Sequence, residues 1–150
     1  MGIALGVLAN NYYNSYTFSH SEIPKKYQQR IDLKEQEILQ LMQKNFGVQI
    51  KIPIVITNKF EGKLYGLTSY ENGKITIYLN KKVMKESIDY MVESVLAHEY
   101  AHAFMFHLGY LHTHKQGHSK KWQQTCVKLG GKSCEQYVNR DDVVLGKLPF

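Results

Sequence analysis

The sequence predicts a single α+β domain, because a helical apolar pattern is followed by strand patterns, a hairpin and two further helical patterns. Hydrophobic residues make up 43% of the 150 residues and charged residues 21%, a balance typical of a globular protein. No repeat or linker rich in Gly, Pro or Ser divides the chain. We therefore expect one domain over residues 1–150, with its core at about 24–130 and loose ends near 1–18 and 140–150.

The first predicted element of the core is an N-terminal helix over about 24–46. Apolar residues recur there at helical spacing, Pro24 suits the first turn, and Gly47 is a natural stop. Residues 3–9 form a short apolar stretch without a preceding Lys or Arg, so we expect a strand or helix edge packed on the core rather than an export signal.

Three strands are predicted next. Residues 48–57 alternate between apolar and polar side chains, which is the period of a half-buried strand. Leu64–Tyr70 and Lys74–Asn80 flank an Asn72-Gly73 pair, and Asn-Gly is a strong signal for a tight hairpin turn. We therefore expect a three-stranded, mainly antiparallel sheet.

Two helices follow the strands. A long helix is predicted over about 84–108, where apolar residues form one broad stripe that Gly109 ends. A further helix is predicted over about 118–129, with Trp122 and Cys126 on one face.

The long helix carries the motif His98-Glu99-Tyr100-Ala101-His102. Residues four apart lie one turn apart on the same helix face, so His98 and His102 can bind one zinc ion. Glu99 lies beside this pair, where a carboxylate can deprotonate a water without ligating the metal. Zinc lowers the pKa of such a water and polarises a scissile carbonyl. The motif therefore predicts a zinc-dependent peptidase with Glu99 as general base.

A third zinc ligand has to come from the later histidines. His107 lies nine residues after His98, on the opposite side of the helix. His112 and His114 fall on a loop, where solvated histidines are common, whereas His118 opens the helix that carries Trp122 four residues on. We favour His118 as the third ligand and keep His114 as the alternative.

With these residues in view, the sequence resembles the SprT-like metallopeptidases, the family that includes Spartan-type proteases. The resemblance rests on residues 98–104 and on Gly117-His118 followed by Trp122, with support from the hairpin strands upstream. It implies a zincin-like mini-domain in which a further helix carries the third ligand. It also implies that His98, His102 and His118 bind zinc, that Glu99 is the general base, and that substrates include DNA-associated proteins.

The substrate is expected to be a protein or peptide, held by main-chain bonds at a sheet edge. The strand Lys74–Asn80 directly precedes the histidine helix and is our candidate edge, with Thr76 and Tyr78 as candidate substrate-binding residues. The net charge of +6 is compatible with a basic surface for nucleic acid, although no cysteine set is present for a separate zinc module. No apolar run is long enough for a membrane span, and the oligomeric state is not predicted.

Cys126 and Cys134 could form one disulfide, but we expect buried free thiols in a reducing compartment, and hence a cytoplasmic protein. Two other functions remain open. One is a non-catalytic, basic nucleic-acid-binding module that keeps the zinc site, which would have no need of Glu99. The other is a metal-dependent ribonuclease, which the histidine spacing and Glu99 disfavour.

Overall fold

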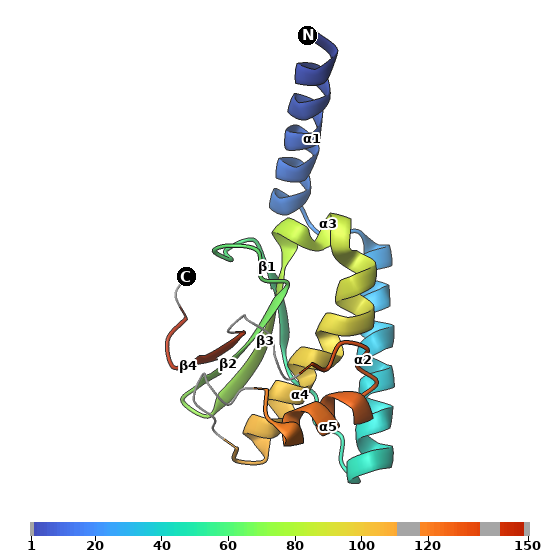
Figure 1. The fold of residues 1–150 in the computed structure, drawn as a ribbon, viewed down its shortest axis with the longest axis vertical. Helices are drawn as coiled ribbons and strands as arrows, with labels where there is room; N and C mark the ends of the chain where they lie inside the picture. The colour runs from blue at the N-terminus through green and yellow to red at the C-terminus, as the bar shows by residue number, and fades with distance from the viewer. Residues whose placement is uncertain (1, 111–117, 136–141, 149–150) are drawn as a thin grey trace.

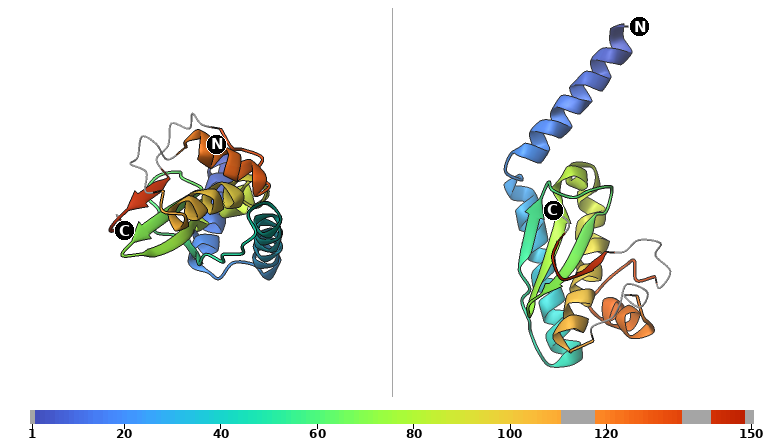
Figure 2. Two further views of the ribbon diagram at one scale, coloured as in Figure 1. Left: turned by 90° about the horizontal axis from the view of Figure 1, so that it is seen from below. Right: turned by 90° about the vertical axis from the view of Figure 1, so that its left-hand side faces the viewer.

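The computed structural model describes residues 2–110, 118–135 and 142–148, which form a mixed β-sheet with helices packed against one of its faces (Figure 1). A first helix, α1 (Gly2–His20), projects away from this body, as the two further views also show (Figure 2). The α+β class is therefore as predicted.

Helix α2 (Lys25–Phe46) has the bounds that the sequence predicts. Pro24 precedes it, and Gly47 ends it in the left-handed conformation with a φ of 75°. Its apolar stripe packs on the core through Ile31, Ile38 and Met42, each of which is buried.

Helix α1 corrects the expectation for the N-terminal apolar stretch, which does not pack on the core. Leu5 and Leu8 are 69% and 65% exposed. Only near its end does α1 meet the body, where Phe18 contacts Tyr27 of α2. None of the helices in the described part of the chain is both long and apolar enough to cross a membrane.

The sheet has four strands in the order β1-β3-β2-β4, where β1 is Ile54–Thr57, β2 is Gly66–Glu71, β3 is Lys74–Asn80 and β4 is Val143–Leu145. Strands β2 and β3 form the predicted hairpin through Asn72 and Gly73, whose φ angles are both positive. Strand β1 pairs in parallel with β3, and β4 pairs in parallel with β2. The sheet is thus mixed and four-stranded, which corrects the three-stranded prediction.

Two further differences concern the strands. The first strand begins at Ile54 rather than near residue 48. Before it, the Ile52 N–H donates to the Tyr100 hydroxyl at 3.0 Å instead of to a neighbouring strand. The second difference is β4, which lies in the segment that we expected to be a loose end. Strand β3 is interior, so it is not the free edge that we proposed for substrate.

The predicted long helix is three consecutive segments, α3 (Lys81–Tyr90), a π-helical turn (Met91–Val95) and α4 (Leu96–His107). Helix α4 lies over β2 and β3, so its buried face and the strands enclose the core (Figure 1). Helix α5 (Lys120–Lys128) packs beside α4 and ends at Leu129.

Cys126 and Cys134 form a disulfide, which corrects our expectation of free thiols. The bond joins α5 to the segment after it. Disulfides are typical of oxidising compartments, so the cysteines no longer support a cytoplasmic location.

Candidate metal centre

Three histidine side chains converge beside the sheet. The Nε2 atom of His102 lies 3.3 Å from that of His98 and 3.2 Å from that of His118, and the remaining separation is 3.1 Å. Zinc–nitrogen bonds of about 2.0–2.1 Å place ligand atoms about 3.3 Å apart at the corners of a tetrahedron. The three nitrogens therefore have the spacing of three tetrahedral zinc ligands.

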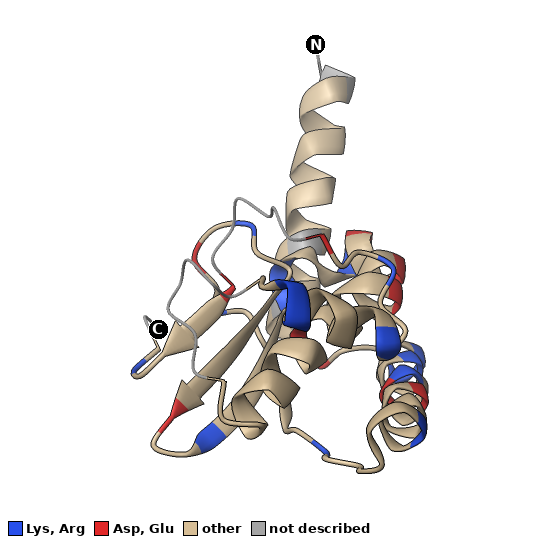
Figure 3. Cartoon of the chain, turned by 60° about the horizontal axis from the view of Figure 1, so that its bottom comes forward, with Lys and Arg blue, Asp and Glu red and all other residues tan. Residues whose placement is uncertain are grey.

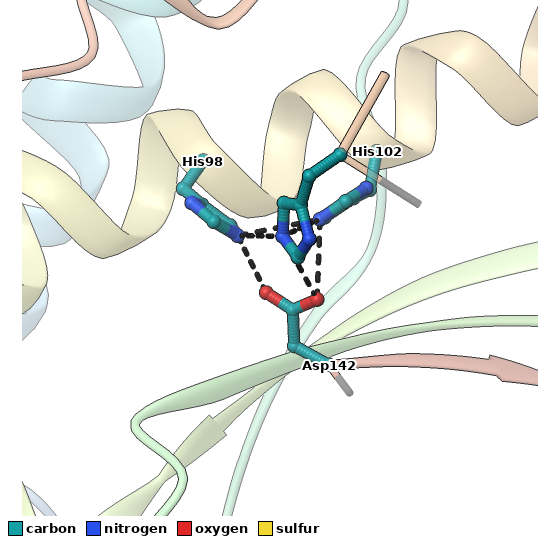
Figure 4. A group of neighbouring side chains, drawn as sticks. His98, His102 and Asp142 are labelled. Carbon is teal, nitrogen blue, oxygen red and sulfur yellow. Dashed lines mark hydrogen bonds and ion pairs between the residues drawn. The ribbon is translucent and has the colours of Figure 1, made fainter. Parts of the chain in front are cut away.

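The carboxylate of Asp142 lies beside the three imidazoles, and His98 and His102 point toward it in Figure 4, so these four residues could hold a metal ion together. Its Oδ2 lies 2.5 Å from His98 Nε2, and its Oδ1 lies 3.2 Å and 3.3 Å from the Nε2 atoms of His102 and His118. Among the described residues, no donor gives Oδ1 a hydrogen bond although this atom is buried. A buried oxygen without a hydrogen bond, facing three imidazole nitrogens, is suited to a metal ion.

Different elements position these ligands. His98 and His102 lie one turn apart on α4, as the motif predicts. His118 lies just before Ser119, the N-cap of α5, so the structure corrects our prediction that His118 itself opens that helix. Asp142 directly precedes β4.

Trp122 fixes the three imidazoles from one side. Its ring is fully buried and its centroid lies 4.6–5.0 Å from those of His98, His102 and His118. The Ser119 side chain accepts a hydrogen bond from the backbone N–H of Trp122 and so caps α5, which begins at Lys120, two residues after His118. The prediction that Trp122 belongs to the core is confirmed.

Glu99 lies between α4 and β2. Its Oε2 accepts a hydrogen bond of 2.6 Å from the Thr68 hydroxyl, and Glu99 lines the same cleft as Asp142. A Cβ atom at Gly66 would lie only 3.1 Å from the Glu99 Cγ, so the glycine allows β2 to approach the carboxylate closely. The Glu99 carboxylate thus lies beside the cluster of His98, His102, His118 and Asp142 and is not part of it.

Burial sets the protonation of the cluster. It lowers the pKa of His102 to about 4, despite the opposing effect of Asp142, so this imidazole is neutral and able to ligate a metal near pH 7. Burial also raises the pKa of Glu99 well above its usual value, and the Asp142 carboxylate adds to this rise. Burial acts to raise the pKa of Asp142 as well, but the histidines around it hold that pKa well below its usual value.

A cleft of about 370 Å³ opens beside the cluster, with His98, Glu99 and Asp142 in its wall. Its other walls come from the start of β2, the helices and the segment after α5. The remaining lining residues are Leu64, Tyr65, Gly66, Tyr90, Ser94, Val95 and Ser133. A larger hollow of about 900 Å³ between α2 and β1 contains none of the four clustered residues, so the smaller cleft is the candidate for substrate.

Other predicted residues lie elsewhere. Ile77 of β3 is paired with Thr68 and faces α4, on the same side of the sheet as Glu99. Thr76 and Tyr78 are its neighbours along the strand, so their side chains lie on the opposite face. They line a separate hollow and are not brought to the metal centre. His107 is outside the cluster, as its spacing predicts, and the structure shows it exposed and stacked on Phe104.

The alternative third ligand, His114, and its neighbour His112 lie outside the described residues. His118 is the later histidine that the structure places with His98 and His102.

Sequence reasoning missed Asp142. Its signal is weak, because an aspartate before a short apolar run such as Val143–Leu145 is common in proteins. Only the pairing of β4 with β2 brings this residue, 40 positions after His102, to the cluster.

Comparison with protein families gives one match: the model described as the SprT-like family matches residues 25–141. Neither the curated proteins nor the solved structures contain a significant match to the chain. The matched range includes α2, the β2–β3 hairpin, Glu99 and the three clustered histidines His98, His102 and His118. It ends one residue before Asp142.

Proposed function

Since the chain belongs to the SprT-like family and brings three imidazoles together beside a buried glutamate, we propose that it is a zinc-dependent endopeptidase. The observation that carries the proposal is the tetrahedral spacing of the three Nε2 atoms, with Glu99 next to the cluster and outside it. Two further features support the proposal. The Thr68 hydroxyl holds the base in position, and the cleft beside His98 gives room for a peptide.

His98, His102 and His118 would hold the ion, which when bound would acidify a water molecule and polarise the scissile carbonyl. Glu99 takes the proton from the attacking water and returns it to the amine that leaves. Thr68 keeps the Glu99 carboxylate turned toward the cluster by donating its hydroxyl hydrogen. The low accessibility of Glu99 keeps competing solvent away from this proton.

We propose protein or peptide as the substrate class, and the experiment below tests whether nucleic acid changes the rate of cleavage. Lys and Arg residues lie on several elements rather than gathering on one of them (Figure 3). The net charge of +6 would suit substrates that are themselves bound to DNA, and the family resemblance is the reason for testing them.

The decisive test is cleavage of casein or of an unfolded protein by zinc-loaded wild type and Glu99→Gln, each with and without double-stranded DNA. The substitution should leave zinc stoichiometry unchanged and lower kcat by about 10²–10⁴, since it removes the general base. Glu93→Gln is the matched control, because Glu93 is an exposed residue that pairs with Lys132.

Full cleavage by the zinc-loaded Glu99→Gln variant would overturn the assignment of the base. Absence of cleavage by the wild type under every condition, with zinc bound, would favour the non-catalytic binding module instead. RNA breakdown that depends on the same metal would favour the ribonuclease.

A further inference from the structure

The segment that contains β4 is paired with β2 beside the candidate active site. The Thr68 N–H of β2 donates to the Asp142 carbonyl at 2.8 Å, and the Gly146 N–H donates to the Tyr70 carbonyl at 2.8 Å. Between these two bonds, residues 143–145 pair with residues 68–70. The side of β2 that faces away from β3 is therefore covered where it passes Glu99.

This side of β2 is the place where an extended peptide could add a strand next to the site. Main-chain pairing at a sheet edge is a common way to hold an extended peptide. Strand β2 carries Thr68, which bonds to Glu99, and Gly66, which lies against it. A peptide paired with β2 would therefore run directly beside the base, and β4 lies in that position instead.

The same segment brings a carboxylate to the metal ligands. Asp142 is 6% exposed, its oxygens lie 2.5–3.3 Å from the three Nε2 atoms, and Oδ1 receives no hydrogen bond from the described residues. Asp142 also lines the same cleft as Glu99, the residue that has to meet the attacking water. Asp142 therefore lies both beside the three imidazoles and in the wall of the cleft that the base lines.

We propose that Asp142 is a fourth metal ligand that can be displaced, and that β4 occupies the position in which a substrate strand would pair with β2. In this arrangement the segment holds the metal centre in a closed form. The regulatory part of this proposal rests on the proposed peptidase function. A substrate peptide, or another extended strand that pairs with β2, would open the centre by replacing β4 and withdrawing Asp142.

The coordination part is tested on full-length protein loaded with Co²⁺, whose visible spectrum reports its ligands. Acetohydroxamate, a small chelator that needs an open coordination position, is titrated into the wild type, Asp142→Ala and Asp142→Asn. Both variants should bind it at least about tenfold more tightly than the wild type, because a site that is closed most of the time binds in proportion to its open fraction. Asp32→Ala is the matched control, since Asp32 is an exposed residue on α2.

The strand part is tested with Val144→Pro, which keeps Asp142 but removes an N–H from the middle of β4. With zinc bound, Asp142→Ala, Asp142→Asn and Val144→Pro should all cleave unfolded protein faster than the wild type, by at least about tenfold for Asp142→Ala. Metal stoichiometry and thermal unfolding, measured on each variant, show that the folded and loaded forms are being compared.

The proposal is overturned if acetohydroxamate binds the wild type as tightly as Asp142→Ala, or if Asp142→Ala keeps its metal and cleaves more slowly than the wild type. A different result separates the two proposals. If the Co²⁺ titrations come out as expected and yet no variant cleaves any protein, the closed coordination stands and the peptidase function fails.

Discussion

At the scale of single residues, the centre depends on how one carboxylate is oriented. Glu99 is almost completely buried, and the hydroxyl of Thr68 donates to it from the neighbouring strand. This hydrogen bond stabilises the ionised carboxylate and opposes the rise in pKa that burial causes. Thr68 therefore holds the proposed base from the strand side and favours its charged form, against the larger effect of burial.

Replacing Thr68 by valine, which has nearly the same shape, should move the acidic limb of the pH–rate profile to higher pH. The sign follows because the lost hydrogen bond favoured the charged form, so the pKa of Glu99 rises and the base is protonated over more of the acidic range. A hydrogen bond to a charged group is worth about 1.5–3 kcal/mol. At pH values on the acidic limb, kcat/KM should therefore fall by roughly tenfold or more. Measuring kcat/KM from pH 5 to 9 checks this.

The control for that series is Thr76→Val, because Thr76 lies on the opposite face of the sheet. An acidic limb that stays in place in Thr68→Val would show that the hydroxyl does not govern the base.

The residues of the candidate metal centre were predictable to different degrees. Four-residue spacing on a helix is a local property, so His98, Glu99 and His102 could be identified from the sequence alone. His118 was identifiable from its closeness to Trp122 on the next helix. Asp142 was not, because its position depends on a strand pairing between distant parts of the chain.

At the scale of elements, the route from β3 to the motif helix is not one regular helix. Ser87 departs from helical geometry with a φ of −127°, and the π-helical turn Met91–Val95 follows before α4 begins. Turns of this kind are frequent at functional sites, and here the turn places Val95 against the start of β2. The apolar pattern predicted a helix along the whole span, because a π turn leaves little signal in the sequence.

Gly66→Ala tests how tightly β2 is packed on this turn. The added Cβ would lie 2.9 Å from Val95 Cγ1 and 3.1 Å from Glu99 Cγ, so the strand or the helix has to move. We expect the free energy of unfolding to fall by about 1–3 kcal/mol, together with a loss of cleavage. Urea unfolding measures the first effect.

Gly6→Ala is the matched control, since nothing lies within 4 Å of a Cβ at that position of α1. Equal stability of the Gly66→Ala and wild-type proteins would show that β2 and the turn can separate without cost.

At the scale of the whole molecule, the metal centre joins parts that are far apart in the sequence. Helix α4 carries His98 and His102, His118 lies just before the N-cap of α5, and Asp142 lies just before β4. The disulfide Cys126–Cys134 secures the segment after α5, whose Ser133 carbonyl lies 3.4 Å from His98 Nδ1. The hairpin, α2 and α5 followed from local patterns, whereas the parallel pairings of β1 and β4 required tertiary contacts that no local pattern encodes.

Removing the metal should therefore destabilise the whole domain. Zinc present at 100 times its dissociation constant adds about 2.7 kcal/mol to the free energy of unfolding, so treatment with a chelator should remove about this amount. Calorimetry of the zinc-loaded and chelator-treated protein measures the difference.

His118→Ala should lose most of this response, whereas His107→Ala should keep it, since His107 is exposed and stacks on Phe104. A chelator effect that is the same in both variants would place the third ligand elsewhere.

The orientation of residue 142 has a consequence for the durability of the protein. Under the proposed peptidase function, a segment that lies beside the chain's own metal centre has to escape cleavage by it. Here the main-chain carbonyl of Asp142 is bonded to the Thr68 N–H, and the group among the histidines is a side-chain carboxylate, which has no amine to release. Because the peptide carbonyl of residue 142 is held by β2, we expect the bond between residues 142 and 143 to resist cleavage as long as β4 stays paired.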